Sequence, residues 1–303
     1  MRGEPQLKLM FETVDVFTAC RFGGNPLAVF PDASSLADEE MQALAAEMNL
    51  SETTFVLPSD NPANSAKVRI FNRTEEMAFA GHPCIGTAFV LSRLGMTVGN
   101  TLRLEVPAGI VPVQLEGDPA NVTGARLTAP QPLSTGAEFE PADVAACVGL
   151  GTEDLQVDGH RPITASMGNP YVIARVAEHA LSRASPDLGL FRSFREGHPE
   201  LGTRFSLLLF AGQGPHLRAR MFAPLAGTFE DPATGSANAP LAGLLLQRSG
   251  ADHAEFTVEQ GIEMGRPSEL RLTATRTGQD IRATVAGDCV PVLSGTAQVR
   301  DDR

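Results

Sequence analysis

Two kinds of segment occur twice in this 303-residue chain, in the same order each time. The first is Gly-Asn-Pro with an apolar run after it, at 24–30 and again at 168–176. The second is a long apolar segment with a polar start, GHPCIGTAFVL at 81–91 and GSANAPLAGLLL at 235–246. This order predicts an old duplication, with two α/β halves that each contain one buried helix. A chance match of two short motifs is the alternative.

The length and charge of the chain narrow the class of protein. A chain of 303 residues suits two domains of about 150 residues each. The net charge of −12 argues against a nucleic-acid or anionic-membrane partner, since both require a positive surface. No apolar stretch reaches the roughly 18 residues that a membrane span needs, and the start MRGEPQLKLMFETVDVF is not that of a signal peptide. The composition is typical of a soluble metabolic enzyme.

Several kinds of chemistry have no signature in the sequence. Lys8 and Lys67 are the only lysines, no P-loop is present, and a Schiff-base lysine is disfavoured. The six histidines show no paired ligand spacing, so we expect no metal and no cofactor. The four cysteines are scattered and never form Cys-x-x-Cys, which predicts reduced thiols and a cytoplasmic location.

Alternation of polar and apolar residues predicts sheets with one wet face. An amphipathic helix is expected at 37–49, with shorter helices at 141–149 and 187–195 and a linker at 129–132. The strand-like runs are 7–17, 26–31, 53–57, 66–72, 101–107, 111–115, 124–128, 162–166, 171–176, 204–211, 217–223, 269–275, 280–285 and 290–300.

The segments 83–94 and 237–247 are apolar around most of their circumference, which predicts helices wrapped by a sheet. Pro83 suits a first helical position, and Ser236 or Asn238 suits a cap. A helix start exposes unpaired N–H groups and partial positive charge. Two such starts in one interdomain cleft would bind a small carboxylate from both sides, with His82 at the opening. The alternative is that His82 only caps the helix and packs.

Two acidic stretches supply candidates for proton transfer. Asp231 and Ser236, in the run 230–236 before the second apolar segment, are predicted to face the same cleft as His82. A capping box with solvated acids is the alternative. Glu52, in NLSETTFV, lies between a helix and a strand-like run and is a candidate general acid/base. A surface glutamate is the alternative.

Five ordered motifs carry a resemblance that covers nearly the whole chain: VDVFTACRFGGNPLAVF, NLSETTFV, RIFNRTEEMAFAGHPCIGTA, RMFAPLAGTFEDPATGSA and EQGIEMGRPSEL. With these motifs the chain resembles the PhzF-like, phenazine-biosynthesis isomerase family, within the diaminopimelate epimerase fold. The resemblance implies an α/β (α+β) protein of two pseudo-symmetric domains. Each domain is expected to be a curved, mostly antiparallel sheet wrapped around a central buried helix, with the active site between the two.

The resemblance also implies a site. Glu52 would be the acid/base residue, and His82 and Asp231 would complete the catalytic group. The residues expected to bind the substrate are Asn25, Gly81, Gly235 and Ser236. The best-known member isomerises a dihydro-hydroxyanthranilate by moving a proton from one carbon to another without a cofactor. A homodimer is the family expectation.

One departure from more distant relatives is informative. Proline racemases and diaminopimelate epimerases of this fold use two facing cysteines, one before each helix. Here Ala80 precedes Gly81, and no thiol lies in Asp231-Pro232-Ala233-Thr234. A two-thiol mechanism therefore lacks both bases, and Cys84 is interpreted as a packing residue.

The sequence thus predicts a cofactor-independent isomerase that moves a proton on a small carboxylated metabolite by general acid/base catalysis. A cysteine-independent racemase or epimerase of an amino or hydroxy acid, and a non-catalytic protein that binds small carboxylates, are the alternatives. The predicted domains are 1–128 and 129–289, with the C-terminal strand 290–303 as a candidate addition to the first.

Overall fold

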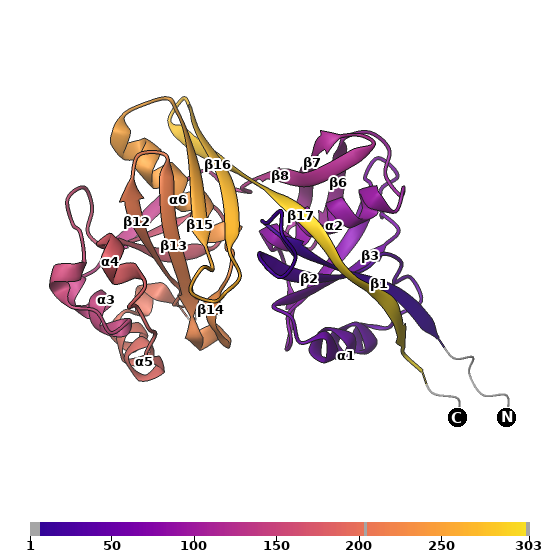
Figure 1. The fold of residues 1–303 in the computed structure, drawn as a ribbon, viewed down its shortest axis with the longest axis horizontal. Coiled ribbons are helices and arrows are strands. Elements are labelled where there is room, and N and C mark those ends of the chain that lie inside the picture. The colour runs from indigo at the N-terminus through magenta and orange to yellow at the C-terminus, as the bar shows by residue number, and fades with distance from the viewer. Residues whose placement is uncertain (1–6, 203–204, 301–303) are drawn as a thin grey trace. The chain divides into compact units, whose positions relative to one another are not determined.

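The computed structural model of the chain describes residues 7–202 and 205–300 and contains two compact units (Figure 1). Unit 1 comprises Met1–Leu127 and Ala286–Arg303, and unit 2 comprises Thr128–Val285. The predictions that fall on 1–6, 204 and 301–303 lie outside the described residues. No helix within the described ranges is long and apolar enough to cross a bilayer.

Unit 1 is built around helix α2. Its elements are β1 (Lys8–Val16), β2 (Asn25–Phe30), α1 (Asp38–Met48), β3 (Glu52–Leu57), β4 (Ala66–Phe71), β5 (Glu76–Met77), α2 (Gly81–Arg93), β6 (Thr101–Val106), β7 (Gly109–Asp118), β8 (Asn121–Thr128) and the second part of β17 (Asp280–Gln298).

The strands of unit 1 form a closed ring. β17 pairs with β1, which continues through β2, β3, β4, β6 and β7 to β8, and β8 pairs with β17. Most pairs are antiparallel. The parallel pairs β2–β3 and β4–β6 are the ones whose connections contain helices, α1 and α2 respectively. A parallel pair requires such a crossover, since a tight turn cannot return the chain to the same direction.

Unit 2 is built in the same way around helix α6. Its elements are β9 (Ser134–Glu138), α3 (Pro141–Cys147), η1 (Thr152–Asp154), β10 (Ile163–Ser166), β11 (Pro170–Arg175), α4 (Glu178–Leu181), α5 (Leu188–Gly197), η2 (Pro199–Leu201), β12 (Leu207–Gln213), β13 (His216–Ala223), η3 (Pro224–Ala226), β14 (Thr228–Asp231), α6 (Gly235–Ser249), β15 (His253–Gln260), β16 (Ser268–Thr277) and the first part of β17.

The pairing of unit 2 repeats that of unit 1 strand by strand. β10–β11 is antiparallel, β11–β12 parallel, β12–β13 antiparallel, β13–β15 parallel and β15–β16 antiparallel. This is the order of β1–β2, β2–β3, β3–β4, β4–β6 and β6–β7 in unit 1. Both Gly-Asn-Pro motifs lead into the second strand of this series. The predicted fold class, two similar halves that each wrap a mostly antiparallel sheet around a central helix, is confirmed.

The central helices are buried because they are apolar on nearly every side. In α2 the ten residues from His82 to Leu91 are all buried. Close packing also explains two glycines inside these helices. A Cβ on Gly86 would come within 2.6 Å of Leu27 Cδ2, and one on Gly243 would come within 2.4 Å of Met167 Cε. Strand β2 therefore lies close to the axis of α2, and the connection between β10 and β11 lies close to the axis of α6.

The element predictions were wrong in particular places. Residues 253–260, which form β15, were not predicted as a strand, although Ala254, Phe256 and Val258 alternate with polar residues. The short strands β5, β9 and β14 were also missed. The two runs 280–285 and 290–300 belong to one continuous strand, β17, which starts in unit 2 and ends in unit 1.

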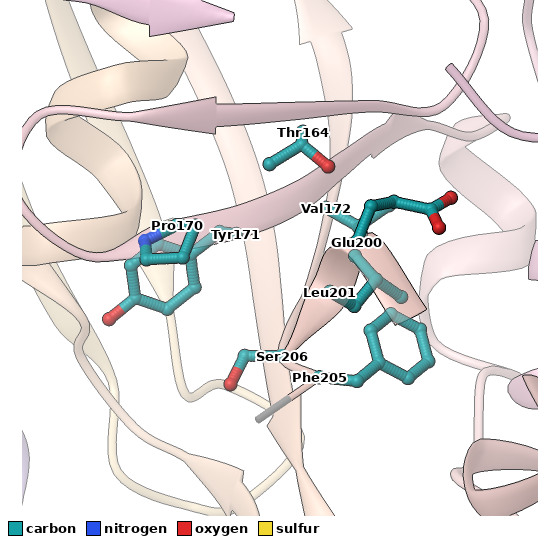
Figure 2. Close-up of a pocket in the computed structure, with 8 residues that line it drawn as sticks. All are labelled: Thr164, Pro170, Tyr171, Val172, Glu200, Leu201, Phe205 and Ser206. Atoms are coloured by element: carbon teal, nitrogen blue, oxygen red, sulfur yellow. The ribbon is translucent and has the colours of Figure 1, made fainter. Parts of the chain in front are cut away.

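A cavity of about 20 Å³ lies in unit 2, beside the ring of Tyr171 (Figure 2). Its lining is Thr164, Pro170, Tyr171, Val172, Glu200, Leu201, Phe205 and Ser206. Such a volume holds about one water molecule, so this cavity is too small for a metabolite.

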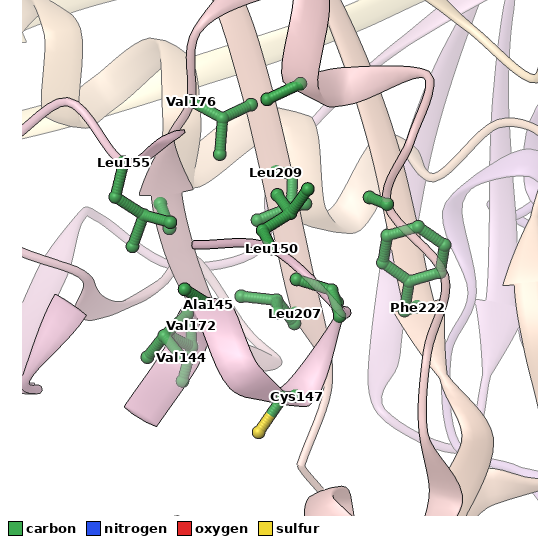
Figure 3. Packing of buried hydrophobic residues seen from close by; sticks show 14 of the residues in the cluster. Val144, Ala145, Cys147, Leu150, Leu155, Val172, Val176, Leu207, Leu209 and Phe222 are labelled. Carbon is green, nitrogen blue, oxygen red and sulfur yellow. The ribbon is translucent and has the colours of Figure 1, made fainter. Parts of the chain in front are cut away.

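The outer helices of unit 2 cover a second apolar layer. α3 and α5 pack together, and the cluster between them and the sheet includes Phe191 of α5. Figure 3 shows Val144, Leu207, Leu209 and Phe222 of the same cluster. α6 instead contacts β10, β11, β15 and β16. The sheet of unit 2 is therefore supported by helices of two kinds, one enclosed by it and the others outside it.

Candidate active site

Glu52 is the first residue of β3, at the place where the NLSETTFV motif meets the first Gly-Asn-Pro motif. β3 runs parallel to β2, with Glu52 opposite Leu27. Beside this pair, Ser51 Oγ donates a hydrogen bond of 3.0 Å to Oδ1 of the fully buried Asn25. The bond fixes the backbone just before Glu52. Whether Asn25 also binds a substrate stays a prediction.

His82 is the second residue of α2, and its imidazole lies against Glu52. Nε2 of His82 is 3.3 Å from Oε2 of Glu52, and both side chains are largely buried, with exposed fractions of 8% and 16%. Burial lowers the pKa of His82 from 6.5 to about 3. The imidazole is therefore neutral at physiological pH. Although the two atoms lie within ion-pair distance, the contact is not an ion pair.

The start of α2 carries no side-chain cap. Its N-cap residue is Ala80, which has no hydrogen-bonding side chain. The helix begins at Gly81, two residues before the predicted start at Pro83, so His82 lies within the first turn and does not cap it. A Cβ on Gly81 would meet only Leu127 Cδ2, at 4.0 Å, so the protein leaves open space beside this residue. The start of α2 thus combines the lack of a side-chain cap with open space beside Gly81.

A buried pair of threonines joins β3 to α2. Thr54 Oγ1 and Thr87 Oγ1 lie 2.8 Å apart, and both residues are fully buried. Thr54 is two residues beyond Glu52 on β3, and Thr87 lies five residues beyond His82 on α2. A satisfied hydrogen bond between buried hydroxyls holds the strand and the helix in register. This contact keeps the Glu52 carboxylate beside the imidazole.

Asp231 ends β14 in unit 2, and only 8% of it is exposed. Thr234 Oγ1 donates a hydrogen bond of 2.5 Å to Asp231 Oδ2. The preceding residue, Glu230, has a different role, since both of its carboxylate oxygens accept hydrogen bonds of 2.8 Å from Arg220. Of the two acids before α6, Glu230 is therefore structural, and Asp231 is held next to the start of the helix.

Gln260 supports the loop that carries Asp231. Its Nε2 donates to the Asp231 carbonyl at 2.7 Å and to Thr234 Oγ1 at 3.1 Å. Its Oε1 accepts from the Thr234 amide at 3.3 Å and from Asn238 Nδ2 at 2.8 Å. Next to it, Gly261 has a φ of +76°, and a Cβ there would lie 2.7 Å from the Pro232 carbonyl oxygen. The EQGIEMGRPSEL motif therefore holds the EDPATGSA motif in place.

The start of α6 also lacks a side-chain cap. The helix begins at Gly235 after the N-cap residue Thr234, whose hydroxyl bonds Asp231 instead of the helix. The prediction that Ser236 or Asn238 caps the helix is wrong. Asn238 Nδ2 donates to the Thr234 carbonyl at 3.0 Å, and Ser236 Oγ lies 2.6 Å from the hydroxyl of Tyr171.

The predicted site residues thus fall into two groups, each at the start of a central helix. Unit 1 brings together Asn25, Glu52, Gly81 and His82, and unit 2 brings together Asp231, Gly235 and Ser236. The sequence reasoning missed Ser51, Tyr171, Thr234 and Gln260. Signals for them existed, since Gln260 is in a recognised motif and Tyr171 directly follows the second Gly-Asn-Pro.

The thiols are poorly suited to act as bases. Cys84 is fully buried in α2, and burial raises the pKa of its thiol to about 12. Cys147 and Cys289 are also buried, and Cys20 is exposed. Within the described part of the chain, no three His, Cys, Asp or Glu side chains lie close enough to hold a metal ion.

Known proteins resemble this chain over nearly its full length. The model of the phenazine biosynthesis-like protein family matches residues 14–295. An uncharacterized isomerase of Mesorhizobium japonicum is 37% identical over 93% of this chain and 96% of its own. The trans-2,3-dihydro-3-hydroxyanthranilate isomerase of Pseudomonas aeruginosa is 36% identical over 95% of this chain and 98% of its own. A crystal structure of a PhzF-family phenazine biosynthesis protein of Bacillus anthracis covers 97% of this chain and 100% of its own, with a TM-score of 0.86 and 26% identity.

Proposed function

The chain belongs to the phenazine biosynthesis-like protein family and is an isomerase, and from this premise we propose that it moves a proton on a small carboxylated metabolite without a cofactor. The observation that carries the proposal is the Glu52 carboxylate, 3.3 Å from a neutral imidazole at the uncapped start of a buried helix. A carboxylate held beside a neutral imidazole suits general acid/base catalysis.

Glu52 is the proposed acid/base residue. Its carboxylate takes a proton from one carbon of the substrate, and the electrons of the broken C–H bond move into the conjugated carboxylate as an enolate-like system. The double bond shifts, and the resulting carboxylic acid of Glu52 returns the proton to a second carbon. Protons and electrons balance without a further reactant. General acid/base catalysis of this kind contributes about 10²–10⁴-fold.

The remaining residues orient the substrate and stabilise the developing charge. His82 presents a neutral ring next to Glu52, so it can hydrogen-bond the reacting part of the substrate without competing as a cation. N–H groups at the two helix starts, together with Ser236 Oγ, bind the carboxylate and the enolate-like charge. Asp231, held by Thr234, completes the polar lining.

We propose further that both groups of residues act on one substrate molecule. The repeated topology supports this, since it puts equivalent helix starts at Gly81 and Gly235. The P. aeruginosa relative is named for trans-2,3-dihydro-3-hydroxyanthranilate, and a compound of that class, a small unsaturated ring with a carboxylate, is the proposed substrate. The homodimer and the cytoplasmic location also remain proposals.

The test replaces Glu52 by Gln and follows deuterium uptake from heavy water into trans-2,3-dihydro-3-hydroxyanthranilate. We expect the wild type to catalyse exchange and E52Q to lose at least about 100-fold in kcat. E12Q is the matched control, since Glu12 is a half-buried carboxylate of the same unit on β1, and it should retain full activity. Exchange that persists in E52Q refutes the assigned role.

Two results would favour the alternatives. Deuterium returned to the same carbon with inversion would indicate a cysteine-independent epimerase. Saturable binding of the carboxylate without any exchange by the wild type would indicate a binding protein.

A further inference from the structure

Tyr171 is the only tyrosine of the chain, which has no tryptophan, and it reaches the start of α6 from β11. Only 9% of the residue is exposed, and its hydroxyl lies 2.6 Å from Ser236 Oγ. Figure 2 shows this hydroxyl pointing away from Glu200 and the small cavity beside the ring. The residue therefore packs with its ring and uses its hydroxyl at the helix start.

The hydroxyl groups at this helix start differ in what they can offer a ligand. The Thr234 hydroxyl donates its proton to Asp231, so it has none left for a ligand. The hydroxyl of Ser236, the second residue of α6, has one proton and can direct it either to Tyr171 or to a ligand. In the 2.6 Å contact either hydroxyl group can be the donor, and this choice decides where the proton of Ser236 points.

A phenol is a stronger acid than an aliphatic alcohol and is the better donor of the two. When Tyr171 donates to Ser236 Oγ, the serine proton has to point elsewhere. The half-buried Ser236 then presents its O–H together with the first amides of α6, and all of these groups are donors. A cluster of donors at the start of a helix is suited to an anion.

Resting on the function proposed above, we infer that Tyr171 is a positioning residue that fixes Ser236 as a hydrogen-bond donor to the substrate carboxylate. Tyr171 acts through Ser236 and has no part in the proton transfer at Glu52. Its contribution is to pre-orient a donor that would otherwise rotate freely, which strengthens carboxylate binding by removing the need to order the hydroxyl on binding.

The experiment is a double-mutant cycle with a carboxylate that absorbs no light in the tyrosine range. Cyclohexanecarboxylate is titrated by calorimetry into the wild type, Y171F, S236A and Y171F/S236A, and cyclohexylmethanol serves as the neutral ligand of similar shape. We expect Y171F and S236A each to weaken carboxylate binding by about three- to tenfold. The double variant should bind no more weakly than S236A alone. Cyclohexylmethanol should not distinguish the four proteins.

Tyrosine fluorescence provides a second measurement, because every tyrosine photon comes from Tyr171. Cyclohexanecarboxylate should change the emission of the wild type in a saturable way, with a much smaller change in S236A. S206A is the matched control, since Ser206 lines the cavity beside the ring but is not the partner of the hydroxyl. It should behave as the wild type in both measurements.

Additive effects of the two substitutions, unchanged binding in Y171F or no carboxylate binding by the wild type would each overturn the inference. These outcomes are separate from the test of Glu52. A chain in which E52Q abolishes exchange while Y171F and S236A act additively keeps the proposed function and loses the inference. Persistent exchange in E52Q, together with non-additive effects of Y171F and S236A, would refute the role of Glu52 and leave the coupling of Tyr171 and Ser236 in place.

Discussion

Glu52 Oε2 lies 3.3 Å from His82 Nε2, across the junction between a strand of the ring and the helix that the ring encloses. Because burial lowers the pKa of His82 to about 3, this imidazole carries no charge at neutral pH. The proposed proton transfer rests on this contact between a carboxyl group and a neutral imidazole.

The neutral state of His82 predicts how stability depends on pH. Its pKa is about 3 in the folded protein and 6.5 in the unfolded chain, so only the unfolded chain takes up this proton between those values. Stability is therefore lost as pH falls below about 6.5. Going from about pH 8 to pH 5.5, the wild type should lose about 1.4 kcal/mol more free energy of unfolding than H82Q does.

Urea unfolding of both proteins at several pH values measures this difference. Because the carboxylates are common to the two proteins, subtracting their curves isolates the contribution of His82. Parallel curves for the wild type and H82Q would show that the pKa of His82 is the same in the folded and unfolded states, contrary to the expectation.

The sequence predicts the elements that depend on local pattern and fails for those that depend on distant contacts. The two central helices could be predicted because they are apolar on nearly every side. The position of Glu52 could be predicted because it lies between a helix and a strand. Tyr171 and Ser236 are 65 residues apart, and Gln260 and Asp231 are 29 apart. No local pattern links such pairs. The starts of the two central helices were predicted two residues too late, since α2 begins at Gly81 and α6 at Gly235. In α2 the prediction followed Pro83, which favours the first position of a helix, but glycine is also found there.

The buried thiols predict resistance to alkylation. The pKa of Cys84 is raised to about 12 by burial, and that of Cys147 to about 12 by burial and by neighbouring carboxylates, so neither forms a thiolate at neutral pH. Iodoacetamide should modify the exposed Cys20 in the native protein. The C20S variant should stay unmodified by intact mass and keep its full activity. Inactivation in step with labelling of Cys84 would instead indicate a thiol-dependent reaction.

Loss of the Gln260 side chain is expected to affect catalysis indirectly, through the position of Asp231. Replacement by Leu removes four hydrogen bonds, to the Asp231 carbonyl, to two groups of Thr234 and to Asn238. We expect Q260L to lose about 2–4 kcal/mol of stability, since buried polar groups are left without partners. Its kcat should fall more than its KM rises. Q247L, at the exposed end of α6, should change stability by less than about 0.5 kcal/mol.

Two glycines of the loop after β15 provide a matched pair. Gly261 and Gly265 have φ values of +76° and +70°, so alanine at either position pays a similar backbone cost of about 1 kcal/mol. The surroundings differ, because a Cβ on Gly261 would lie 2.5 Å from the Arg266 carbonyl oxygen and 2.7 Å from that of Pro232, whereas Gly265 faces open space. Backbone atoms at such distances cannot move aside without displacing the loop that carries Asp231.

G261A should therefore lose substantially more stability than G265A, by about 2 kcal/mol or more, and should also lose activity. G265A should keep its activity, since its extra cost is confined to the backbone of an exposed turn. Thermal unfolding and the exchange assay measure both effects. Equal losses in the two variants would mean that positive φ alone explains the glycines, and that close packing of Gly261 against Pro232 does not hold the Asp231 loop in position.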